Sequence, residues 1–67
     1  MHETLEPLLR RIRDEFVEMP GLSLTEPQAA RLWELDLPLT ATVLRALVDA
    51  RFLTRTAAGL YRRPSAV

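Results

Sequence analysis

The 67-residue sequence contains no cysteine and no lysine, only two glycines, and no apolar run longer than three residues. Without cysteine, the chain has neither a disulfide framework nor a thiolate metal site to stabilise a small core. The short apolar runs exclude a membrane span, and the acidic residues near the start exclude a secretory signal. We therefore expect one small soluble domain in the cytoplasm, with no cofactor, no bound metal and no membrane partner.

Residues that commonly catalyse reactions are also scarce. The one histidine is His2, at the terminus, and neither Ser23 nor Ser65 has a plausible base beside it. Glycine-rich phosphate loops and metal-ligand spacings are missing, and no pair of carboxylates sits in an evident cleft. The sequence therefore predicts that the protein is not an enzyme.

The charged residues balance in number but not in position. Nine arginines face nine acidic residues, so the formal net charge is zero. Residues 1–36 carry eight acids and four bases, whereas residues 37–67 carry five bases and one acid. An acidic first half and a basic second half are therefore expected to give the folded domain surfaces of opposite sign.

Apolar residues recur at helical spacing in residues 4–19, which predicts an amphipathic first helix. Thr4 is the expected N-cap, and Pro7 then falls in the first turn, where a missing N–H is tolerated. Pro20-Gly21 is expected to end this helix, whose apolar face consists of Leu5, Leu8, Leu9, Ile12 and Phe16.

A short strand at residues 22–24 and a second helix at 26–35 are expected next. Thr25 is the N-cap of that helix and Gln28 occupies the reciprocal capping-box position. The inner face of the helix is expected to contain Ala29, Leu32 and Trp33.

A third helix is predicted at 37–50 and a hairpin at 52–63, all within a single domain of residues 1–67. The helix is capped by Asp36, with Thr40 as the alternative cap. The hairpin is expected to turn through a three-residue loop that ends in Gly59, and the segment 22–24 is a candidate third strand. The remaining residues, 64–67, are expected to form a flexible tail.

The order of helix, short strand, helix, turn, helix and hairpin resembles the winged helix-turn-helix domain of bacterial regulators. The resemblance covers Leu24 to Tyr61 and is similar to the MarR-like and ArsR-like families. It is carried by Ala30-Arg31-Leu32, Leu35-Asp36-Leu37, Val43-Leu44, Leu47-Val48, Ala50-Arg51-Phe52-Leu53 and Gly59. It implies a mainly α fold with a small β-hairpin wing. Arg51 stands where the family usually has glycine, and a left-handed Arg there would cost roughly 1 kcal/mol.

In those families the third helix enters the DNA major groove and the wing reaches the flanking backbone. The resemblance therefore implies that Ala41, Thr42 and Arg45 face the base edges. It likewise implies that the phosphates are contacted by Arg55, Arg62 and Arg63.

Three functions remain open from the sequence. The first is a DNA-binding transcriptional regulator or accessory factor that binds double-stranded DNA, with affinity helped by a homodimer. The alternative is a winged-helix protein-protein interaction module, such as an adaptor, an anti-activator or a dimerisation domain. The third is a homodimer or filament in which the acidic half of one copy meets the basic half of the next.

Overall fold

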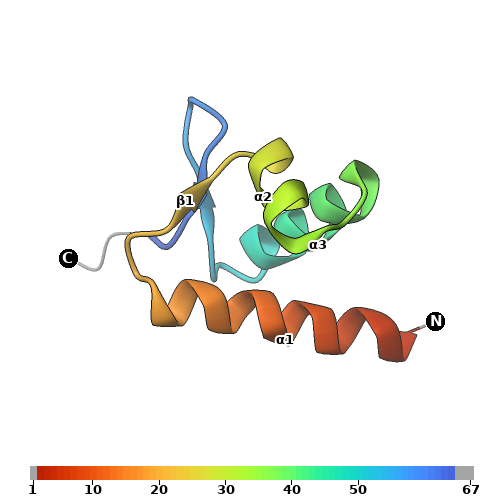
Figure 1. Ribbon diagram of the computed structural model, residues 1–67. Coiled ribbons are helices and arrows are strands. Elements are labelled where there is room, and N and C mark those ends of the chain that lie inside the picture. The colour runs from red at the N-terminus through yellow and green to blue at the C-terminus, as the bar shows by residue number, and fades with distance from the viewer. Residues whose placement is uncertain (1, 65–67) are drawn as a thin grey trace.

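The computed structural model describes the backbone of residues 2–64 and the side chains of residues 5–64. Of the predicted flexible tail 64–67, residues 65–67 lie outside the described residues. The elements in chain order are α1 (His2–Glu18), β1 (Ser23–Leu24), α2 (Glu26–Trp33), α3 (Leu37–Asp49), β2 (Thr54–Arg55) and β3 (Tyr61–Arg62). The long α1 runs along one side of the domain, and the tip of the β2–β3 hairpin extends away from it (Figure 1). This is the predicted mainly helical, winged-helix-like arrangement.

The three strands form one antiparallel sheet in the order β1-β3-β2. The short segment after α1 is therefore the predicted third strand, although it begins at Ser23 rather than at residue 22. Tyr61 pairs with Leu24 on one side and with Arg55 on the other. Because neighbouring side chains in a strand point to opposite faces, the central β3 buries Tyr61 and exposes Arg62.

Local hydrogen bonds determine where α2 and α3 begin. The predicted capping box of α2 is present, since the Thr25 hydroxyl accepts from the Gln28 N–H and the Gln28 amide accepts from the Thr25 N–H. The Asp36 carboxylate accepts from the Leu39 N–H at 2.8 Å and caps α3. The alternative cap, Thr40, instead lies buried inside the helix and donates its hydroxyl to the Asp36 carbonyl at 2.8 Å.

The start of α1 differs from the prediction. The helix begins at His2, so Thr4 is not its N-cap and Pro7 lies inside the helix rather than in its first turn. A proline at this position removes the hydrogen bond that an N–H would donate to the Glu3 carbonyl, so the first turn has one bond fewer to the rest of the helix. Helix ends commonly shift by this much.

Both shorter helices end on a non-glycine residue in the left-handed conformation. Glu34 follows α2 with φ 56°, and Arg51 follows α3 with φ 65°. After α3, the N–H groups of Arg51 and Phe52 donate to the carbonyls of Val48 and Leu47, the pattern of a Schellman motif. Arg51 therefore adopts the left-handed conformation that glycine adopts more readily. The two helices stop at Trp33 and Asp49, short of the predicted residues 35 and 50.

The core lies between α1, α2, α3 and the sheet. Phe16 of α1 is fully buried and meets Trp33 edge to face, with ring centroids 6.1 Å apart. Leu32 is 52% exposed, so its predicted place on the inner face of α2 is wrong, and Ala30 is buried instead. At about 100° per residue, Leu32 lies roughly 100° from the centre of the buried face formed by Ala29, Ala30 and Trp33.

Candidate nucleic-acid interface and an arginine-lined groove

The residues predicted to read bases lie on one helix, α3. Thr42 and Arg45 are exposed and Ala41 is half-buried. The Thr42 hydroxyl donates to the Pro38 carbonyl at 2.9 Å. Its hydrogen is therefore engaged within the helix, and its oxygen remains able to accept a hydrogen bond from a ligand.

The fold brings Arg45 of α3 together with Arg55 of β2. Both line a small depression of about 160 Å³ between the helix and the hairpin, together with Glu26, Val48 and Tyr61. Arg55 also lies over the Tyr61 ring, 5.8 Å from its centroid. Two guanidinium groups, one on a helix and one on a strand, thus share one surface.

An acidic group lies in the same depression. The Tyr61 hydroxyl donates to Glu26 Oε2 at 2.7 Å, which joins β3 to the first turn of α2. Burial raises the pKa of Tyr61 above 10.0, and the hydrogen bond and negative charge of Glu26 raise this pKa further, against the opposing effects of Arg55 and Arg45. The lining of the depression therefore includes a neutral phenol, a carboxylate and two arginines.

The other predicted phosphate contacts lie elsewhere. Arg62 is exposed and pairs with Ser23 and Thr54, on the face of the sheet opposite Tyr61. The guanidinium of Arg63 lies over the ring of Phe52, 3.9 Å from its centroid. Arg63 therefore belongs to a different surface from the one shared by Arg45 and Arg55.

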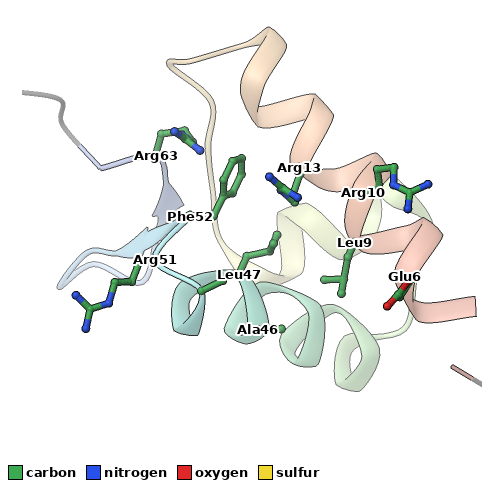
Figure 2. A pocket seen from close by; sticks show the side chains of 10 residues that line it. Glu6, Leu9, Arg10, Arg13, Ala46, Leu47, Arg51, Phe52 and Arg63 are labelled. Carbon is green, nitrogen blue, oxygen red and sulfur yellow. The ribbon is translucent and has the colours of Figure 1, made fainter. Parts of the chain in front are cut away.

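That second surface is a groove of about 570 Å³ between α1 and the end of α3. Arg13 of α1 lies over Phe52 as well, 5.0 Å from the ring centroid, and Figure 2 shows the ring between Arg13 and Arg63. Arg10 and Arg51 also line the groove. We call this surface the arginine groove; its four basic residues are Arg10, Arg13, Arg51 and Arg63.

The sequence alone did not identify the arginine groove or the part played by Glu26. In the sequence, Arg10 and Arg13 fall on the polar face of an amphipathic helix, and Arg51 follows the expected end of another. A local signal existed in Phe52, which is an aromatic residue directly after an expected helix end and is flanked by arginine. Its meaning required knowledge of which face of α1 packs beside it.

Two general features of the described chain bear on function. Among the described side chains, those of residues 5–64, no three His, Cys, Asp or Glu gather closely enough to hold a metal ion. None of the helices within residues 2–64 is long and apolar enough to cross a membrane. No protein-family model, curated protein sequence or solved structure matches the chain significantly.

Proposed function

We propose that this chain is a small winged-helix DNA-binding protein, a transcriptional regulator or an accessory factor. The observation that supports the proposal is that Arg45 of α3 and Arg55 of β2 line one depression. A helix in the major groove with a hairpin beside it requires basic groups on both elements, facing the same way. The resemblance to MarR-like and ArsR-like domains points in the same direction.

Each residue of this surface has a role that follows from its chemistry. Arg45 pairs in two-pronged fashion with guanine, and the small Ala41 and Thr42 let the helix backbone approach the base edges. Arg55 contacts phosphate next to the groove, and the exposed Arg62 contacts phosphate from the outer face of the sheet. Arg63 is left out of this proposal because it lies on Phe52 in the arginine groove.

The size of the domain sets an expectation for its binding mode. Single DNA-binding modules bury about 600–1,000 Å² of protein surface on DNA. The depression also contains the carboxylate of Glu26, which weakens attraction to phosphate. We therefore propose that two copies bind together on DNA, as a homodimer.

The test is binding to duplex DNA over a range of salt concentrations. Each phosphate contact contributes a slope of about 0.9 in the plot of log affinity against log salt. Arg55→Ala is expected to reduce that slope by about one, and Arg45→Ala to relax the preference for one base sequence. The control is Arg11→Ala, which removes an exposed arginine of α1 outside both surfaces. If the affinity for duplex DNA does not change with salt concentration and is equal in all these variants, the proposal is wrong.

A second candidate function, protein interaction, is favoured by a different observation. Leu24, Pro27 and Leu32 line a groove of about 540 Å³ beside β1, which is an edge strand of the sheet. Leu32 is 52% exposed there, and burying it against a second copy would remove apolar surface from water. Sedimentation equilibrium distinguishes this function. A dimer that Leu32→Ser dissociates supports a dimerisation module, whereas a monomer at every concentration contradicts it.

A further inference from the structure

The arginine groove concentrates positive charge on the α1 side of the domain, away from Arg45 and Arg55. Four arginines and one acid, Glu6, line it. Arginine stays protonated at every ordinary pH. Figure 2 shows the Arg51 guanidinium directed away from the hollow, so the other three arginines and Glu6 leave two more positive than negative charges there. Like charges gathered around one hollow repel each other, and an anion placed among them removes that repulsion.

The floor of the groove is apolar. It is lined by Leu9, Leu47 and Phe52, by Ala46 of α3 and by Ala50 just after that helix. Charged and apolar surfaces therefore face the same space. Figure 2 shows Leu9 and Leu47 directed into the space between α1 and α3. A bare anion would meet the guanidinium groups but would leave this apolar floor facing water.

Stacking on Phe52 prepares two of the arginines to bind. A guanidinium that lies over an aromatic ring uses its flat face for that contact, so its N–H donors point outward in its own plane. Arg63 is half-buried, and its Nη1 is fully buried with no hydrogen-bond acceptor within the described part of the chain. Side chains held in this way lose little freedom when a ligand binds.

We propose that the arginine groove binds a small organic anion in which a carboxylate or phosphate is attached to a flat apolar group. The anion pairs with the edges of Arg10 and Arg13, and the apolar group lies on Leu9 and the edge of Phe52. The volume of about 570 Å³ is within the range of small-molecule sites. This site is independent of the proposed DNA surface, because it shares no residue with it.

Titration with three probes tests the required chemistry. Naphthoate carries both the anion and the flat apolar group, naphthamide lacks the charge, and inorganic phosphate lacks the apolar group. Naphthoate is expected to bind at least tenfold more tightly than either of the other two. The amide signals of Leu47, Phe52 and Arg63 are expected to shift in nuclear magnetic resonance spectra of the full chain.

A pair of neighbouring arginines provides the matched control. Arg10 lines the groove and Arg11 does not, although both are exposed on α1. Arg10→Gln is expected to weaken naphthoate binding about three- to fivefold, the upper part of the range for an exposed ion pair. Arg11→Gln is expected to leave this binding unchanged, and circular dichroism confirms that both variants are folded.

Filling the floor provides a second, uncharged test. Ala46→Leu adds apolar volume to the groove and is expected to weaken naphthoate binding by more than fivefold without changing the charge. Any of three results would overturn the proposal. These are equal losses of naphthoate affinity in the Arg10 and Arg11 variants, phosphate binding as tight as naphthoate binding, and no naphthoate binding at millimolar concentration. Duplex DNA binding is expected to be the same in Arg10→Gln and the native chain, so failure of one proposal leaves the other intact.

Discussion

The Tyr61 hydroxyl donates a 2.7 Å hydrogen bond to Glu26 Oε2 and so connects the central strand of the sheet to the start of α2, across 35 residues of sequence. Tyr61 is 3% exposed, so its hydroxyl is largely shielded from water and depends on Glu26 for a hydrogen-bond acceptor. Glu26 also lines the same depression as Arg45 and Arg55. Both the stability of the sheet and the charge of the proposed DNA surface therefore depend on this pair.

Stability is expected to fall at alkaline pH because of Tyr61. Its pKa is higher in the folded chain than the ordinary value of 10.0, chiefly through burial, so the folded state holds the phenol proton more tightly than the unfolded state does. The stabilisation is complete below about pH 10 and is lost as the pH rises through the folded-state pKa. Denaturant unfolding between about pH 9 and 11 measures this loss.

The composition makes that measurement specific to one side chain. The chain has one tyrosine, no cysteine and no lysine, so no other side chain titrates in this range. Tyr61→Phe is expected to lower stability at neutral pH and to remove the alkaline decline. An equally steep decline in the Phe variant would show that the pKa of Tyr61 is not the cause.

Removing the negative charge of Glu26 is expected to strengthen DNA binding. Glu26→Gln keeps an oxygen that accepts the Tyr61 hydrogen bond but takes one negative charge away from the depression. Affinity for duplex DNA should rise about two- to fivefold at low salt and less at high salt, where the charge is screened. Fluorescence anisotropy measures this change. Glu18→Gln, at an exposed position on α1, is the matched control, and an equal gain there would point to net charge alone.

Glycine at the corner after α3 is expected to stabilise the domain. Arg51 has φ 65°, which costs an L-residue with a side chain about 1–2 kcal/mol, whereas glycine adopts this conformation readily. Glycine also increases the conformational entropy of the unfolded chain, which offsets part of this gain. Arg51→Gly should therefore raise the free energy of unfolding by about 0.5–1 kcal/mol, or Tm by a few degrees. Ala50, the preceding residue, has φ −79°, so Ala50→Gly should lose a similar amount in thermal unfolding. Destabilisation by both changes would contradict the argument.

The two leucines Leu44 and Leu32 are expected to respond very differently to the same substitution. Leu44 is fully buried and Leu32 is 52% exposed. Leu44→Ala should cost about 2–5 kcal/mol, a large part of the roughly 3–10 kcal/mol available to a domain of this size. Leu32→Ala should stay within about 0.5 kcal/mol. Urea unfolding measures the loss of stability in each variant. Similar losses in both would indicate that Leu32 is buried on the inner face of α2.

Sequence reasoning was most accurate where the stabilising contacts are local. The caps at Thr25 and Asp36 and the turn at Gly59, which has φ 85°, involve residues within four positions of each other. It was least accurate where a short helix offers two choices of face. In α2 a leucine and an alanine compete for burial, and the packing against α1 and α3 leaves Leu32 outside.

Candidate site residues divide in the same way. That Arg45 and Arg55 share a depression follows from the winged-helix-like order of elements, which the sequence implied. The position of Arg63 does not follow from that order. The hairpin brings Arg63 near Phe52, but only the packing of α1 beside that ring supplies the second guanidinium, that of Arg13.

The sequence by itself determined the order of elements, the caps of α2 and α3, and a chain without cysteine or lysine whose positive charge is entirely arginine. These properties depend on composition, periodicity and hydrogen bonds between near neighbours. Tertiary structure alone decided which arginines meet, because Arg13 of α1 is far in the chain from the hairpin that carries Phe52 and Arg63. Coulomb attraction and stacking act over a few ångströms, so their outcome was set only when the core brought α1 against the end of α3.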